Sequence, residues 1–173
     1  MDEHDKAIAA ARYIHSALVD ANCSAFLWWG LAYAAPPAQI QDAVHRQKMR
    51  DEGLILVDAD RVNGVNPFRE RTPKYYTFKQ FSRFIPSGSV RLETPASEVP
   101  LVAAFRSADA RRIVLVFINP DRSLCAVAPR ITSGRSYKLI ECWLTDRTNR
   151  CVPGQWTGTL PAESVCTLVY QQS

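Results

Sequence analysis

A series of short apolar segments separated by turn residues fills the second half of the chain, and it restricts the possible folds more than any other feature. The six segments are residues 90–92, 101–105, 113–118, 123–127, 137–144 and 165–170. Between two of them, Asn119-Pro120-Asp121 is a strong turn signal, because proline suits the second position of a β-turn and aspartate favours turns through its own side chain. Short strands at this spacing predict an antiparallel β-sandwich over residues 86–173.

The first 85 residues follow a different pattern, in which helical and strand-like segments alternate. Ala7, Ala11 and Ile14 recur at the spacing of one helix face, which predicts an amphipathic helix over residues 5–20. Residues 24–32 are apolar at both alternating sets of positions, as is typical of a strand buried on both faces of a parallel sheet. The further elements that we expect are a helix at 39–50, a strand at 54–58, a loop at 60–73 and a helix at 75–84. This order predicts an α/β arrangement.

The strand predicted at 24–32 needs neighbours on both of its edges. Within the first 85 residues, only the short run 54–58 is available to pair with it. Left unpaired, it would expose Trp28 and Trp29 and promote aggregation. We therefore expect residues 1–85 to be the C-terminal end of a larger α/β barrel, followed by the β-sandwich at 86–173, in a chain that is β-rich overall.

Composition excludes several classes of protein. Of the 173 residues, 47% are apolar, which is too many for a disordered chain. No apolar run reaches the ~18 residues that a membrane span requires, so we expect no membrane span. The 21 Lys and Arg residues are scattered among 17 Asp and Glu residues, and we expect no nucleic acid partner. The acidic start Asp2-Glu3 is unlike a secretory signal, so we expect no signal peptide in this chain.

Several segments resemble glycoside hydrolase family 30, which includes glucosylceramidase, β-1,6-glucanases and galactanases, and glucuronoxylanases. These segments are residues 13–18, 25–30, 51–58, 74–88, 113–119 and 160–165. The strongest is the aromatic run 74–88, which is similar to the final helix of the family and contains the motif Phe81-Ser82-Arg83-Phe84-Ile85. The resemblance covers nearly the whole chain except an insert at 36–50. It implies that residues 1–85 are the last strand and helices of a truncated (β/α)8 catalytic barrel and that residues 86–173 are its β-sandwich side domain.

The same resemblance implies a retaining β-glycosidase, in which one glutamate is the acid/base and a second is the nucleophile. In the family these residues lie on the fourth and seventh barrel strands, which would precede Met1. We therefore expect no catalytic residue in this chain, and no hydrolysis by this chain alone. Glu3 is a poor nucleophile candidate because it follows no apolar strand, whereas a catalytic carboxylate needs a rigid strand end behind it.

Trp28 and Trp29 are the candidate substrate-binding residues. Neighbouring side chains on a strand point to opposite faces, so one indole should face the barrel mouth. Trp29 matches the substrate-contacting tryptophan of the family better, and an indole face suits the C–H face of a pyranose. The alternative is that both indoles are ordinary core residues. Members specific for glucuronoxylan carry an arginine soon after this position, but residues 30–35 contain none. The resemblance therefore implies a neutral β-linked glucan, galactan or glucoside.

We expect no cofactor and no metal site. His4 and His15 would lie about 16 Å apart along one helix, too far to share an ion. Cys142 and Cys151 flank a predicted turn and are candidates for a disulfide, but the five cysteines leave the pairing open. The family is mostly secreted or lysosomal, which implies an extracellular or lysosome-like location for the parent enzyme. The expected partners are β-linked carbohydrate and the missing N-terminal part of the barrel.

The alternative function is a non-catalytic carbohydrate-binding β-sandwich module, whose aromatic side chains hold sugar without turnover. This alternative predicts that the 173-residue chain folds cooperatively as a monomer and is retarded by an immobilised β-glucan. A barrel fragment, by contrast, would depend on the rest of its barrel for a complete core.

Overall fold

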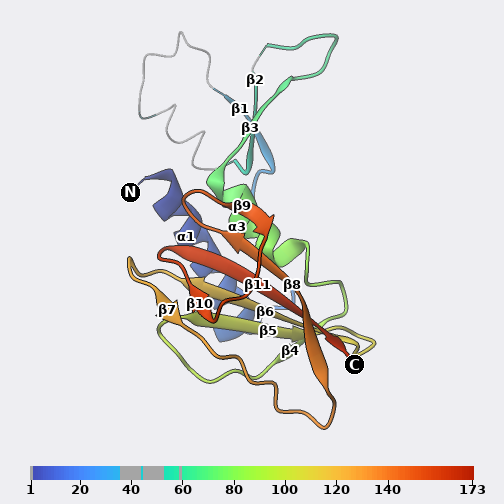
Figure 1. Ribbon diagram of the computed structural model, residues 1–173. Coiled ribbons are helices and arrows are strands. Elements are labelled where there is room, and N and C mark those ends of the chain that lie inside the picture. The colour runs from blue at the N-terminus through green and yellow to red at the C-terminus, as the bar shows by residue number, and fades with distance from the viewer. Residues whose placement is uncertain (1, 36–43, 45–52, 59) are drawn as a thin grey trace.

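A six-stranded antiparallel sheet forms the centre of the molecule (Figure 1). The structure is a computed structural model that describes residues 2–35, 44, 53–58 and 60–173. In spatial order the strands of this sheet are β4 (Val90–Leu92), β5 (Leu101–Arg106), β6 (Arg112–Asn119), β11 (Ser164–Gln172), β8 (Tyr137–Thr145) and β9 (Arg150–Pro153). The long strand β11 pairs with β6 on one side and β8 on the other. The sequence predicted all of these strands except β9, and the β-rich antiparallel fold is confirmed.

Strand β6 is buried on both of its faces, which explains its continuous apolar sequence. Seven of its eight residues are buried. Because successive side chains of a strand point to opposite faces, Val114 and Val116 contribute to one apolar cluster while Leu115 and Phe117 contribute to another. The sheet therefore separates two cores, one on each face.

Two helices cover the first of these faces (Figure 1). Helix α1 (Glu3–His15) begins at a capping box, in which the Asp5 backbone N–H donates to Asp2 and the Asp2 backbone N–H donates to Asp5. It continues into the π-helical turn η1 (Ser16–Asp20). Helix α3 (Pro73–Ser82) starts with a proline, whose missing N–H is not needed in a first helical turn. The helices predicted at 5–20 and 75–84 are present, each starting two residues earlier than expected.

A two-stranded sheet of β7 (Cys125–Ala126) and β10 (Thr159–Leu160) lies over the second face. Leu160 is completely buried in the cluster beneath it. At the predicted turn after β6, the Asn119 side-chain amide donates to the carbonyls of Ser123 and Pro161, both at 2.8 Å. These hydrogen bonds join the β6 turn to the segment just before β11. Because the β7–β10 sheet covers one face of the large antiparallel sheet, the predicted antiparallel sandwich is the observed architecture.

A small three-stranded sheet lies at one end of the molecule, next to the start of α3 (Figure 1). Its strands are β1 (Ala32–Ala35), β2 (Ile55–Asp58) and β3 (Phe68–Arg71), with β1 and β2 parallel and β3 antiparallel to β2. The strand predicted at 54–58 is present as β2, whereas the predicted loop at 60–73 contains β3.

The strand predicted at 24–32 is wrong in its position. Residues 21–31 form neither helix nor strand, and β1 begins only at Ala32. The physical reason is the lack of a ladder partner: β2 is short, and its first residue, Ile55, pairs with Ala32. Within the described residues, no strand pairs with the preceding segment. An apolar sequence without a neighbouring strand therefore remains irregular here.

The predicted boundary at residue 85 does not separate two cores. Ile8, Ile14 and Phe81 from the helices share one apolar cluster with Val116 and Val165 of the large sheet. The division into two domains stays a prediction. The helix predicted at 39–50 lies outside the described residues, apart from Val44. Among the residues that the structure describes, no helix has both the length and the apolar character to cross a lipid bilayer.

Candidate functional site

The predicted substrate-binding tryptophans lie in the irregular segment that follows η1. The Trp29 side chain is 84% exposed. Trp28 is half-buried, and its ring centroid lies 6.3 Å from that of Phe26, with the two planes tilted by 46°. The two neighbouring indoles therefore differ in environment: one packs against an aromatic ring, and the other presents its faces to solvent.

The backbone after Trp29 is held in a conformation that only glycine tolerates well. Gly30 has φ of +84°, in the left-handed region. A Cβ at this position would overlap Cε2 of the Tyr33 ring and lie 2.8 Å from its Cζ. Tyr33 belongs to β1, and the Ile55 amide of β2 donates to the Leu31 carbonyl at 2.9 Å. Tyr33 was not predicted as a site residue, but its ring packs against the turn that carries Trp29.

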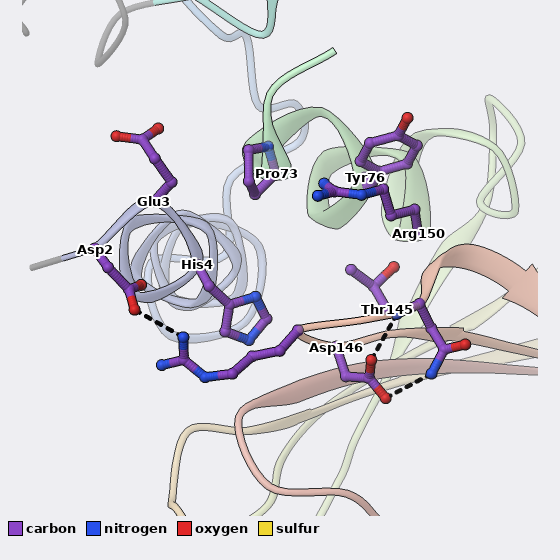
Figure 2. A pocket seen from close by; sticks show the side chains of 10 residues that line it. Asp2, Glu3, His4, Pro73, Tyr76, Thr145, Asp146 and Arg150 are labelled. Carbon is purple, nitrogen blue, oxygen red and sulfur yellow. Dashed lines mark hydrogen bonds and ion pairs between the residues drawn. The ribbon is translucent and has the colours of Figure 1, made fainter. Parts of the chain in front are cut away.

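A second candidate site is a polar pocket of about 280 Å³ at the N-terminal end of α1 (Figure 2). Its lining residues are Asp2, Glu3, His4, Pro73, Tyr76, Thr145, Asp146, Arg147, Asn149 and Arg150. Asp2, Glu3 and His4 come from the helix end, whereas Thr145, Asp146 and Arg150 come from the opposite wall, at and after the end of β8. The pocket therefore lies where the N-terminal helix meets the sandwich.

Arg147 forms ion pairs with three carboxylates at this pocket. Its guanidinium contacts Asp2 at 2.7 Å, Asp5 at 3.1 Å and Glu163 at 2.8 Å. The hydrogen bond from Arg147 lowers the pKa of the Asp2 carboxyl to about 2. The same kind of bond lowers the pKa of Glu163. Arg147 thus joins the start of α1 to the turn before β11, and this role is structural.

The carboxylates that line the pocket are engaged by other groups. Glu3 lies 3.0 Å from the Lys6 ammonium and 3.8 Å from the buried Lys74 ammonium. Asp146 accepts hydrogen bonds from the backbone amides of Thr148 and Asn149 at 2.8 and 2.7 Å. A general base needs an accessible lone pair directed at substrate. Because Glu3 and Asp146 are already engaged by lysines and backbone amides, the pocket has the character of a polar interface between α1 and the sandwich.

The histidines named by the sequence analysis serve as structural hydrogen-bonding groups. The Nε2 atom of His4 is 2.7 Å from the Glu163 carbonyl, and that of His15 is 3.2 Å from the Val102 carbonyl. Both therefore bind helix α1 to the sandwich. In the described part of the chain, no cluster of three or more possible metal ligands is present.

Two curated proteins match nearly the whole chain. Glucuronoxylanase XynC of Bacillus subtilis is 21% identical over 99% of this chain and 36% of its own length. The glucuronoxylanase XynC of Bacillus subtilis strain 168 is 23% identical over 97% of this chain and 35% of its own length. No protein-family model matches.

Solved structures show the same fold. A glycoside hydrolase family 30 subfamily 8 xylanase, Xyn30A from Clostridium acetobutylicum, matches with a TM-score of 0.63 at 21% identity, over 99% of this chain and 40% of that one. A family 30 endoxylanase from Clostridium papyrosolvens matches with a TM-score of 0.62 at 18% identity, over 95% and 38%. The chain resembles glycoside hydrolase family 30. The resemblance predicted from the sequence is thus confirmed.

The likeness to family 30 involves only part of each relative. The chain spans 35–36% of the curated relatives and 38–40% of the two family 30 structures. A conserved exported protein from Bacteroides fragilis has a TM-score of 0.69 over 96% of this chain and 34% of that one, at 18% identity. What the family 30 proteins do as whole enzymes therefore has to be tested for this chain.

The family resemblance also bears on Glu3. The nucleophile of family 30 is expected at the end of a barrel strand, but Glu3 lies in the first turn of helix α1, between two lysines. Its position at a helix start favours structural pairing rather than attack on a sugar. The sequence did not indicate Tyr33 or Arg147. Tyr33 contacts the nearby Gly30 turn, whereas Arg147 contacts Asp2, which is 145 positions away.

Proposed function

We propose that this chain is part of a retaining β-glycosidase, comprising the last strand and helices of a (β/α)8 barrel with its side sandwich. Two observations support this: the resemblance to family 30 over nearly the whole chain, and the exposed indole of Trp29, the residue that the resemblance matches to the substrate-contacting tryptophan of the family. The second observation carries the assignment of a role to this chain. Trp29 forms part of the sugar-binding surface, and the neighbouring Trp28 packs against Phe26.

The two catalytic glutamates belong, in this proposal, to the part of the enzyme that the chain does not include. The engagement of Glu3 by two lysines supports its exclusion as a nucleophile. The isolated chain should therefore bind sugar weakly and hydrolyse none. Measurable hydrolysis of an aryl β-glucoside, lost in Glu3→Gln, would contradict this.

We further propose that the sugar next to Trp29 is neutral, as in a β-linked glucan, galactan or glucoside. The curated relatives are named as glucuronoxylanases, so the alternative is a xylan that carries uronate. The absence of arginine and lysine from residues 30–35 favours the neutral sugar, because a buried or partly buried carboxylate requires a charged partner.

Titration of the chain with defined oligosaccharides tests both parts of the proposal. Neutral β-gluco- and galacto-oligosaccharides should perturb tryptophan fluorescence, and Trp29→Ala should abolish the response, because stacking needs the indole face. Tyr13→Ala is the matched control, since Tyr13 is another exposed aromatic, at 73%, on helix α1. Stronger binding of a xylo-oligosaccharide with a glucuronate branch would contradict the neutral sugar. A response that survives Trp29→Ala would contradict the site.

The non-catalytic module receives less support from the arrangement of aromatics. Over residues 86–173, the exposed large apolar side chains are Val90, Val99, Leu124, Ile140 and Val152, none of them aromatic. A sugar-binding surface needs an accessible ring. Trp29 and Phe68, in contrast, are exposed outside the sandwich. The partner proposed for the chain is thus β-linked carbohydrate, bound together with the remaining barrel in an extracellular or lysosome-like compartment.

A further inference from the structure

Two buried cysteines lie side by side on neighbouring strands of the large sheet. Cys142 is on β8 and Cys166 on β11, and their sulfur atoms are 3.8 Å apart. Both are free thiols, and so are Cys23, Cys125 and Cys151. Cys142 and Cys151 are the candidate pair that flanks the predicted turn. The structure instead brings Cys142 next to Cys166, through the pairing of β8 with β11.

The register of these strands places the two thiols on one face of the sheet. Cys142 is opposite Leu168 and Cys166 is opposite Leu144, so the cysteines form a diagonal pair. Both side chains belong to the apolar cluster beneath the β7–β10 sheet. Side chains in such diagonal positions on antiparallel strands are still neighbours. Diagonal neighbours are about 7–8 Å apart, so bringing the two sulfurs from 3.8 Å to the ~2 Å of a disulfide requires a shift of the β8 or β11 backbone together with side-chain rotation.

Cys142 is also the more accessible of the two. It is 9% exposed, compared with 2% for Cys166. The pairing of β8 with β9 covers only Trp143–Thr145, so Cys142 lies where the edge strand ends. The hydrogen bond between the thiols lowers the pKa of Cys142 and raises that of Cys166. Of the two paired thiols, Cys142 is thus the one that would react first with a reagent from solution.

We propose that Cys142 and Cys166 form a redox-active thiol pair, which a small-molecule disulfide such as oxidised glutathione converts into a disulfide between β8 and β11. The Cys142 thiolate attacks one glutathione sulfur, forms a mixed disulfide and releases one glutathione thiolate. Cys166 then loses its proton and attacks the Cys142 sulfur, which releases the second glutathione. Two protein thiols are oxidised, and one disulfide is reduced to two thiols.

The disulfide would covalently link β11, a central strand of the large sheet, to its neighbour β8. β11 also holds helix α3, because the Thr167 hydroxyl donates to the Gln80 carbonyl at 2.9 Å. The disulfide closes a loop from residue 142 to residue 166, which lowers the conformational entropy of the unfolded chain and so stabilises the folded state. The expected consequence is a folded state that is more resistant to heat when oxidised.

Peptide mapping of the native 173-residue chain tests the proposal. The chain is incubated with oxidised glutathione, its remaining thiols are alkylated under denaturing conditions, and it is digested without reduction. We expect a linked Cys142–Cys166 peptide as the main cross-link and a rise of several degrees in the unfolding midpoint, reversed by dithiothreitol. Alkylation of both cysteines in the treated protein, or a main cross-link to another cysteine, would overturn the proposal.

Single substitutions separate this pair from the other cysteines. Cys142→Ala should lose both the cross-link and the oxidation-dependent rise in midpoint. Cys23→Ala is the matched control and should retain both, because Cys23 is exposed and lies outside the apolar cluster that contains the pair. An equal rise in both variants would contradict the assignment. If Cys142→Ala does not fold, the peptide map of the unsubstituted chain still decides.

Discussion

Strand β6 and the segment 24–31 are both mostly apolar, but only β6 forms a strand. Each is a continuous apolar run, and each resembles a strand buried on both faces. In β6, Val116 and Ile118 are completely buried. In the other segment, Leu27 is 91% exposed and Trp29 is 84% exposed. The difference shows that an apolar run becomes a strand only where neighbouring backbone is available.

The neighbours of the two segments account for this difference. β6 pairs with β5 over six residues and with β11 over eight. Its hydrogen-bonding groups are therefore satisfied on both edges while its side chains enter two cores. Residues 24–31 have no such ladder within the described structure, and an unpaired apolar edge is a site for association with another strand. In the proposed enzyme, the remaining barrel strands would supply that partner.

Truncation of one leucine in the sandwich and one in the segment 24–31 should give the largest difference in the free energy of unfolding. Leu168 of β11 is completely buried in the second core, so Leu168→Ala should lower the free energy of unfolding by about 3 kcal/mol. Leu27→Ala is the matched control, because Leu27 is 91% exposed, and it should change the same quantity by less than about 0.5 kcal/mol. Urea unfolding followed by circular dichroism measures both. A similar loss in the two variants would mean that Leu27 is buried in solution.

Local patterns predicted most of the sandwich, because its strands are short, apolar and separated by turns such as that at Asn119. They missed β9, β10 and β3, since these strands are four residues long or shorter, and β9 and β3 also contain charged residues. Arg69 and Glu70, for example, indicate a loop until β2 supplies a partner. Strands of this length are defined by their neighbours rather than by their own composition.

Some residues of the candidate sites could be predicted from the sequence, and others could not. The adjacent tryptophans are visible in the sequence, because their residue type alone indicates a stacking surface. Arg147 is one of many scattered arginines, and its partner Asp2 is 145 positions away. Cys166 is likewise indistinguishable from the other cysteines until the register of β8 and β11 is known. Contacts of this kind depend on the tertiary fold and leave no local signal.

An intermediate effect is expected where helix α3 meets the sandwich. The buried Thr167 hydroxyl donates to the Gln80 carbonyl, so Thr167→Val should leave that carbonyl without this donor and cost about 1–2 kcal/mol of stability. Thr157→Val is the control, because Thr157 is exposed and its hydroxyl contacts only another exposed threonine, Thr159, at 3.0 Å. Chemical unfolding of the two variants provides the comparison. Equal stabilities would show that α3 is not anchored by this bond.

Acid should weaken the junction between α1 and the sandwich. Asp2 has its pKa lowered from 3.8 to about 2, and that of Glu163 is also lowered from 4.5. Groups whose folded pKa is depressed stabilise the fold above their unfolded pKa and lose this contribution as the pH falls through the folded value. The unfolding midpoint should therefore decrease between about pH 4.5 and pH 2.

Substitution of the arginine identifies the source of this pH dependence. Arg147→Gln should lower the midpoint at pH 6 and flatten its acid dependence, because the carboxylates lose the charge that keeps them ionised. Arg135→Gln is the control, since the Arg135 guanidinium contacts a neutral amide, that of Gln172, at 3.4 Å. Thermal melts across the pH range record both variants. An acid dependence in Arg147→Gln as steep as in the unsubstituted chain would contradict this role.

The smallest effect on stability, and the most local one, is expected at the turn beside Trp29. Gly30→Ala introduces a side chain at positive φ and against the Tyr33 ring, so the turn must rearrange. Because this segment lies outside the main strands, the unfolding midpoint should change little, while the quenching of tryptophan emission by acrylamide should change clearly. Gly134→Ala is the control, since a Cβ there meets nothing within 4 Å. If both variants quench alike, the Tyr33 ring does not position Trp29, and the exposed indole is not held for a ligand.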